Sequence, residues 1–244
     1  MAFQEAVQAL CGPCFSPGIS APVSEKKRVF RLPEAAVCPN AVVSYLRGRG
    51  IDTEVIGDCL ARQILCESRK YRNCVFIGRD KTGEARFACL RGTHDNFKQD
   101  APGSDKRFGF CLPARDADCP RLAVAESPID ALSLATLVKR YGGDWRESNY
   151  LSLGGTAPRA LLQYLQDHPQ ITEISLCLDN DRAGLDGANR IEQAVREDPE
   201  LTKRIRLIFH NPPPMECGKD YNEFLCAEIQ AKKGRKQQAK VPVR

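Results

Sequence analysis

The sequence predicts an α/β protein in which a parallel sheet with flanking helices follows a small α+β subdomain. Two observations lead to this prediction. Between residues 116 and 230, short apolar runs of strand type alternate with helical patterns. Ahead of them, residues 40–90 hold a helical stretch and then two short strands with a hairpin turn between them. Regular alternation of strands and helices is typical of a parallel sheet covered by helices.

The second half of the chain repeats the strand and helix unit four times. Ser127 and Pro128 supply an N-cap and a first-turn proline, so a helix is expected to start there. Gly154 and Gly155 end the second strand. The predicted strands are 122–125, 150–153, 174–178 and 205–209, and the predicted helices are 128–138, 158–167, 185–195 and 221–229.

The first half has a different pattern. Residues 40–65 are helical with a break at Gly48-Arg49-Gly50, and strands are expected at 73–77 and 85–90 around a turn at 79–83. Residues 91–110 are polar and basic. We therefore divide the chain into an N-terminal helix remnant and linker, a basic α+β subdomain, an α/β domain and a basic disordered tail, with the bounds 1–27, 28–115, 116–230 and 231–244.

Composition excludes several classes of protein. The chain has 244 residues, of which 42% are hydrophobic and 27% charged, which is typical of globular domains and not of disordered or fibrous proteins. No stretch approaches the roughly 18 apolar residues of a membrane span. The 12 Cys are scattered, which suits free thiols in a reducing compartment. We expect a cytoplasmic protein without a membrane partner.

Net charge differs strongly along the chain. It is +6 for residues 1–115, −7 for 116–230 and +6 for 231–244. A basic first half and tail suit a polyanion such as nucleic acid, whereas the acidic second half suits metal ions or a solvated surface.

Acidic residues follow the predicted strands at the points where these end. Glu126 follows the first strand, Asp179 and Asp181 follow the third, and Asp220 follows the loop after the fourth. The carboxyl ends of parallel strands share one edge of a sheet, so these side chains can converge on a hard cation such as Mg²⁺. Asp130 lies one helical turn after Glu126 and can face the same cluster.

Each acidic residue also has a simpler explanation. Asp179-Asn180-Asp181 can form an Asx turn or cap the next helix, and Glu126 can be a helix-start acid that the helix dipole favours. Cys11 and Cys14 form the one C-x-x-C of the chain, and no second pair accompanies them, so we expect no zinc in this chain.

The order of these motifs resembles the Toprim domain of bacterial primases, topoisomerases and some nucleases. Glu126-Ser127-Pro128-Ile129-Asp130 is similar to the primase pattern of a Glu with an Asp four residues on. Asp179-Asn180-Asp181-Arg182-Ala183-Gly184 is similar to its D-x-D-x-A-G, and Gly154-Gly155-Thr156 to its glycine loop. In Gly218-Lys219-Asp220-Tyr221-Asn222-Glu223, Asn222 stands where primases have a second Asp. The resemblance assigns 116–230 to Toprim and 28–115 to a primase-like subdomain.

The resemblance extends upstream. Phe76-Ile77-Gly78-Arg79-Asp80, Arg91-Gly92-Thr93 and residues 103–110 are similar to an uncharacterised domain that is paired with Toprim in proteins of conjugative and mobilisable elements. Residues 3–12 are similar to the closing helix of the primase-type zinc ribbon, so we expect that ribbon to be missing from this chain.

The resemblance implies Mg²⁺ or Mn²⁺ as cofactor and phosphoryl (nucleotidyl) transfer as activity. Asp179 and Asp181 would hold the metal, with Glu126, Asp130 and Asp220 contributing, and Glu126 would be the general acid or base. The expected nucleotide loop comprises Gly154, Gly155, Thr156 and Lys219, and the expected nucleic-acid-binding residues are Arg79, Arg91, Lys98, Lys106 and Arg107.

The implied partners are single-stranded DNA as template, nucleoside triphosphates, and a relaxase or helicase of the same mobile element. Two alternatives stay open. A catalytically silent DNA-binding module for replication or mobilisation would bind DNA without a need for Mg²⁺, and a Toprim nuclease would cleave DNA with the same carboxylates. A topoisomerase would need a separate cleavage domain with a nucleophilic Tyr, for which 244 residues leave no room.

Overall fold

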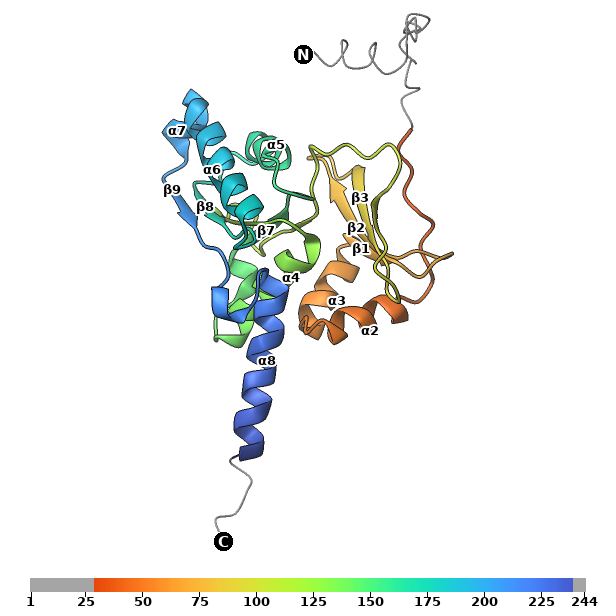
Figure 1. Cartoon of the computed structure of the whole chain (residues 1–244). Coiled ribbons are helices and arrows are strands. Elements are labelled where there is room, and N and C mark those ends of the chain that lie inside the picture. The colour runs from red at the N-terminus through yellow and green to blue at the C-terminus, as the bar shows by residue number, and fades with distance from the viewer. Residues whose placement is uncertain (1–28, 239–244) are drawn as a thin grey trace, which may run out of the picture.

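The computed structural model describes residues 29–238, which form two sheets that pack around shared helices (Figure 1). The expected helix remnant and linker over 1–27 lies outside the described residues. Within 29–238, no helix combines the length and the apolar character needed to cross a membrane.

The first sheet is antiparallel, with the strand order β1-β2-β3-β4. Its hairpin was predicted, and the Asp80 carboxylate fixes the turn by accepting hydrogen bonds from the backbone N–H of Thr82 at 2.9 Å and of Glu84 at 3.1 Å. Two helices precede this sheet. The elements are α2 (Asn40–Gly48), α3 (Thr53–Ala61), β1 (Leu65–Glu67), β2 (Cys74–Arg79), β3 (Ala85–Arg91) and β4 (Lys98–Asp100).

The second sheet has the order β5-β7-β6-β8-β9, in which β5 is antiparallel to β7 and all other pairs are parallel. This confirms the predicted parallel sheet with flanking helices behind a small α+β region. Its elements are β5 (Cys111–Leu112), β6 (Arg121–Ala125), α4 (Pro128–Arg140), η1 (Trp145–Glu147), β7 (Asn149–Ser152), α5 (Arg159–Asp167), β8 (Glu173–Leu176), α6 (Arg182–Glu197), α7 (Pro199–Arg204), β9 (Leu207–His210), η2 (Met215–Cys217) and α8 (Tyr221–Gln238).

Helix α4 lies between the two sheets, and residues 128–137 are all buried. Ile129 and Leu132 belong to one continuous core with Val55 of α3 and Phe76 of β2. A second core fills the other face of the parallel sheet, under α5 and α6. The two modules therefore share a core, and neither sheet packs independently of the other.

Three stretches differ from the sequence prediction. Residues 64–65 do not continue α3, because Leu65 pairs with Phe76 in β1. Strands β1, β4 and β5 are only two or three residues long, too short to show a period of two. Helix α8 continues to Gln238, so residues 231–238 are helical where a disordered tail was predicted.

Glu67 closes the N-terminus of α2 from a distant position. Its side chain is fully buried and accepts hydrogen bonds from the backbone N–H of Ala41 at 2.8 Å and of Val42 at 3.1 Å. Pro39, at the N-cap, makes no side-chain capping bond. Arg72 forms an ion pair with the Glu67 carboxylate. The end of β1 thereby holds the start of α2.

We expect Glu67→Ala to lower the free energy of unfolding by about 3 kcal/mol, because two buried N–H groups lose their acceptor. Glu67→Gln keeps an oxygen acceptor and is expected to lose about half as much. Urea denaturation measures both. The control is Glu84→Ala, which removes an exposed ion pair to Arg86 and should change stability by less than about 0.5 kcal/mol. Equal effects of the two alanine variants would contradict the capping role.

Candidate metal centre

Glu126 and Asp179 lie side by side at the carboxyl edge of the parallel sheet. Glu126 directly follows β6, and Asp179 follows the end of the neighbouring strand β8. The backbone N–H of Asp179 donates a hydrogen bond of 3.2 Å to Glu126 Oε1. The backbone of Asp179 thus binds the carboxylate of Glu126, although 53 residues separate the two.

Asp181 is the N-cap of helix α6, which agrees with the simpler explanation that an Asp of this motif caps the next helix. Its carboxylate accepts a hydrogen bond of 3.0 Å from the backbone N–H of Gly184. A Cβ at Gly184 would lie 2.1 Å from the carbonyl oxygen of Asp179 and 2.9 Å from Glu126 Oε1. The turn between Asp179 and α6 is therefore closed so tightly that only glycine fits at position 184.

Asn180 ties this turn to the loop that precedes α8. Its side-chain amide donates hydrogen bonds to the carbonyl oxygens of Pro213 at 3.0 Å and Gly218 at 2.9 Å. Its backbone N–H donates a hydrogen bond of 2.9 Å to the carbonyl oxygen of Lys219. Lys219 Nζ consequently lies 3.7 Å from Asp179 Oδ2. The sequence analysis missed Asn180 as a positioning residue, although it stands in the middle of the D-x-D motif.

Asp220 and Asp130 lie behind this first group. Asp220 caps α8 by accepting a hydrogen bond of 2.7 Å from the backbone N–H of Glu223. Asp130 is buried in α4 and accepts hydrogen bonds from the Ser127 hydroxyl at 2.6 Å and from the backbone N–H of Asn222 at 3.2 Å. Both oxygens of Asp130 therefore have a partner within the protein, and its role as a metal ligand remains a prediction.

Asn222, where the primase pattern has an Asp, is buried and links three elements. Its side-chain amide donates hydrogen bonds of 2.9 Å to the carbonyl oxygen of Arg49 and to the Ser133 hydroxyl. Arg49 follows α2 in the first module, Ser133 belongs to α4, and Asn222 to α8. An amide suits this place because a carboxylate has no hydrogen to donate to the Arg49 carbonyl.

The carboxylates raise one another's pKa. Burial, Glu126 and Asp220 raise the pKa of Asp179 to about 7, against the opposing effect of Lys219. Burial and Asp220 raise the pKa of Asp130 to about 6. Burial, with Asp181 and Asp130, raises the pKa of Glu126. The cluster accumulates negative charge that Lys219 alone does not balance.

This donor set fits Mg²⁺ or Mn²⁺, which prefer carboxylate oxygens and would relieve the mutual repulsion. Asp179, Asp181 and Glu126 are the residues that would hold the ion, with Asp130 and Asp220 behind them. In residues 29–238, no three His, Cys, Asp or Glu side chains lie as close together as metal ligands do. Binding would therefore require rotation of these side chains.

The expected nucleotide loop borders Glu126. The backbone N–H of Gly155 donates to the Glu126 carbonyl oxygen at 3.1 Å, and Gly154 and Gly155 have φ angles of +67° and +141°, which glycine adopts without strain. Arg190 of α6 donates to the Thr156 hydroxyl at 3.3 Å. Arg190 therefore holds this loop against α6, a role that no sequence motif indicated.

The five predicted nucleic-acid-binding residues fall into two places. Arg91 and Lys98, paired across β3 and β4, line a small hollow together with Ser127 at the start of α4. Ser127 directly follows Glu126 in the sequence, and within residues 29–238 neither Arg91 nor Lys98 has an ion pair. The other three bond to their own module: Arg79 to the carbonyl oxygens of Gly83 and Gln63, Lys106 to Asp100, and Arg107 to Asp105.

Comparison with known proteins agrees with this arrangement. Residues 123–225 match the family model described as Toprim-like, and residues 44–117 match a family of unknown function, DUF3991. The chain contains a Toprim-like domain preceded by a DUF3991 region. The Toprim-like domain holds every predicted carboxylate, and the DUF3991 region holds the five residues predicted to bind nucleic acid.

A curated relative and two solved structures resemble the chain. The uncharacterised protein pXO2-78 of Bacillus anthracis is 30% identical over 151 residues, which are 56% of this chain and 42% of that protein. This chain thus spans less than half of the length of that relative. The primase fragment of the bacteriophage T7 primase-helicase protein has a TM-score of 0.50 at 18% identity, with 79% of this chain and 72% of that chain covered.

The DnaG primase catalytic domain bound to single-stranded DNA has the same TM-score, 0.50, at 19% identity, with 81% of this chain and 71% of that chain covered. At these identities the similarity establishes a common fold. The Toprim-like domain and the region before it thus have the fold of primase catalytic cores.

We expect Mg²⁺ to raise the melting temperature of the protein more at pH 8 than at pH 5.5. The pKa of Asp179 is higher in the folded protein than in the unfolded chain, so protonation of this residue stabilises the metal-free fold. That stabilisation is fully present below about pH 4 and is lost as the pH rises through about 7. Protons therefore compete with the metal below pH 7. Thermal melts with and without Mg²⁺ measure the effect, and Asp179→Asn should reduce it. An equal Mg²⁺ shift at both pH values would contradict the site.

We expect Asn222→Asp to lower the free energy of unfolding by about 3 kcal/mol, because it places a second buried carboxylate beside Asp130 and removes the donor to Arg49. Urea denaturation measures the loss. Asn189→Asp, at an exposed position of α6, is the matched control and should stay within about 0.5 kcal/mol. Undiminished stability together with tighter Mg²⁺ binding would instead make position 222 part of the metal centre.

Proposed function

We propose that the chain is a primase-type nucleotidyltransferase that joins ribonucleotides on a single-stranded DNA template with Mg²⁺ or Mn²⁺. The observation that carries the proposal is the hydrogen bond from the Asp179 backbone N–H to Glu126, which places two acidic residues side by side at the ends of neighbouring parallel strands. The primase-like fold supports the same reaction class.

In this proposal each part of the site has one task. Metal held by Asp179 and Asp181 would offset the charge of the nucleotide phosphates. Glu126, whose pKa burial raises, is suited to accept a proton from the attacking 3′-hydroxyl or to return one. Lys219 contacts the triphosphate, since its ammonium group attracts phosphate oxygens, and the glycine loop at 154–156 lies beside Glu126 as the neighbouring wall of the site.

Arg91 and Lys98 would hold the template. Neither has an ion pair in the described chain, so both are available to phosphates, whereas Lys106 and Arg107 are neutralised by Asp100 and Asp105. Contacts of this kind hold a strand without reading its sequence. The resemblance of the DnaG structure bound to single-stranded DNA supports a single-stranded template.

The cellular setting belongs to the same proposal. We infer a protein of a mobile genetic element that acts in the cytoplasm with a relaxase or helicase of that element. The plasmid-type relative from Bacillus anthracis supports this setting.

A second candidate is a catalytically silent DNA-binding module. Asn222 favours it, because this residue stands where primases have an acidic residue and serves as a buried link between α2, α4 and α8. Such a module would bind DNA equally well with and without Mg²⁺.

The test is template-directed incorporation of labelled ribonucleotides on single-stranded DNA with Mg²⁺ or Mn²⁺. We expect product from the wild type and at least about a 100-fold loss in Asp179→Ala/Asp181→Ala and in Glu126→Gln. Asp186→Asn, an exposed acid on α6, is the matched control and should keep full activity. Binding of DNA without product would favour the silent module, and metal-dependent cleavage of the template would favour a nuclease.

A further inference from the structure

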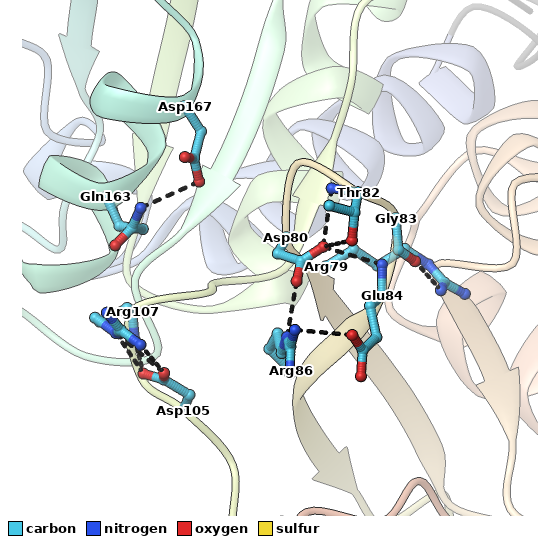
Figure 2. Close-up of polar contacts among 10 residues, drawn as sticks. All are labelled: Arg79, Asp80, Thr82, Gly83, Glu84, Arg86, Asp105, Arg107, Gln163 and Asp167. Atoms are coloured by element: carbon cyan, nitrogen blue, oxygen red, sulfur yellow. Dashed lines mark hydrogen bonds and ion pairs between the residues drawn. The ribbon is translucent and has the colours of Figure 1, made fainter.

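A second concave site lies between the tip of the β2–β3 hairpin and helix α5, away from the carboxylates of the metal centre (Figure 2). It has a volume of about 290 Å³, close to the lower limit for small-molecule sites. Its floor is largely apolar and includes Ile77, Phe108, Pro113 and Ala160. The hairpin belongs to the DUF3991 region and α5 to the Toprim-like domain, so both modules build this groove, which we call the hairpin groove.

Two aromatic rings of α5 line one wall of the hairpin groove. Tyr164 and His168 are stacked, with ring centroids 3.9 Å apart and an angle of 15° between the planes. His168 Nδ1 lies 2.9 Å from the Tyr164 carbonyl oxygen, which can only accept a hydrogen bond. The imidazole therefore donates from Nδ1, and its ring orientation is fixed. A rigid, half-buried ring pair of this kind offers a stacking surface for a planar base.

The opposite wall carries positive charge that the protein does not neutralise. Arg79 donates hydrogen bonds of 2.8 and 2.9 Å to the carbonyl oxygens of Gly83 and Gln63, which fix the guanidinium but leave its charge in place. Lys81, at the tip of the turn, is exposed and has no ion pair within residues 29–238. Arg107, to the left of Arg79 in Figure 2, is neutralised by Asp105.

The two acidic residues of the groove differ in how many hydrogen bonds their carboxylates accept from the protein. The Asp80 carboxylate receives hydrogen bonds from Thr82, Glu84 and Arg86, which lower its pKa and occupy both oxygens. Asp167, at the end of α5, receives one bond of 3.2 Å from the Gln163 amide on Oδ2. Figure 2 shows Gln163 and Asp167 across the groove from the hairpin turn. Asp167 Oδ1 is thus open to a donor in the groove.

We propose that the hairpin groove binds a nucleotide that carries an exocyclic amino group, as a site separate from the metal centre. The base stacks on the ring pair of Tyr164 and His168, and its amino group donates to Asp167, as carboxylates accept from the cytosine amino group in nucleic-acid recognition. The phosphate lies against Arg79 and Lys81. The ligand can be a free nucleotide or one unit of a single strand, which share this chemistry.

The size and charge of the groove favour this ligand over simpler ones. A bare metal ion would find only Asp167 and Nε2 of His168 among the carboxylate and imidazole ligands, fewer than such an ion requires, since Asp80 is saturated by its own turn. A purely apolar molecule would leave Arg79 and Lys81 without a partner. A nucleotide satisfies the aromatic wall, the acceptor and the cations together.

The test uses the full chain in EDTA, so that binding at the carboxylates through metal is suppressed. Isothermal titration with AMP, UMP and ribose 5-phosphate measures free nucleotides, and fluorescence anisotropy with labelled (dA)₁₀ and (dT)₁₀ measures single strands. We expect AMP to bind at least about fivefold more tightly than UMP, and ribose 5-phosphate to bind most weakly. If only (dA)₁₀ binds, the ligand is a unit of a strand, and if AMP binds and (dA)₁₀ does not compete, it is a free nucleotide.

Three substitutions locate the site. Lys81→Glu should weaken the affinity for the ligand at least fivefold, whereas Lys70→Glu, an exposed lysine beyond the other end of β2, should leave it within twofold. His168→Ala should weaken it similarly, and His168→Phe should restore it because the stack is kept. Asp167→Asn should remove the preference for AMP over UMP.

The site is separable from the proposed catalysis. Asp179→Ala/Asp181→Ala should abolish primer synthesis and leave binding in the groove unchanged. Failure of the wild type to bind AMP and (dA)₁₀, or equal binding by wild type, Lys81→Glu and His168→Ala, would overturn the proposal whatever the result of the primer assay. Loss of binding in Asp179→Ala/Asp181→Ala alone would likewise overturn it, because the ligand would then occupy the metal centre.

Discussion

Burial of helix α4 between the two sheets is the constraint on which the rest of the structure depends. Residues 128–137 lose contact with solvent, so each polar group among them needs an internal partner. Ser133 and Thr136 donate to carbonyl oxygens one turn earlier, and Thr136 also accepts from the backbone N–H of Asp52 in the first module. The helix is thereby fixed against both modules, and Glu126, just before it, is fixed with it.

The carboxylate cluster is held by backbone contacts, not by favourable contacts among its side chains. Asp179 reaches Glu126 through an N–H, Asn180 holds the loop before α8 through carbonyl oxygens, and Gly184 allows α6 to start directly against Asp179. The charges themselves repel one another, as the raised pKa of Asp179 indicates. Like charges that a fold forces together at a strand edge repel one another less when a cation lies between them, and this is the physical basis of the proposed metal centre.

Much of this arrangement follows from the sequence because it depends on local rules. Glu126 and Asp179 stand at the ends of apolar strands, and parallel strands bring their carboxyl ends to one edge. The hairpin was equally visible, since Asp80 and Gly83 carry the chemistry of its turn. The function of Asn222 was not visible, because its partners Arg49 and Ser133 lie 173 and 89 residues away. The division of the basic residues into two groups has a different cause: Asp105 neutralises Arg107 from only two residues away, and a net charge count does not show which charges pair.

In both proposed sites, residues from the two modules face one another. The Toprim-like domain contributes the carboxylates, and Arg91 and Lys98 of the DUF3991 region line a hollow with Ser127 at the start of α4. The hairpin groove repeats this division, with Arg79 and Lys81 facing rings and an acid of α5. Both places combine an acidic side from one module with a basic side from the other. A nucleotide or a strand carries both phosphates and amino groups, so only the joined modules present both kinds of partner to it. The links from Asn222 to Arg49 and from Lys139 to Asp52 then support binding indirectly, because they hold the two sides at a fixed distance.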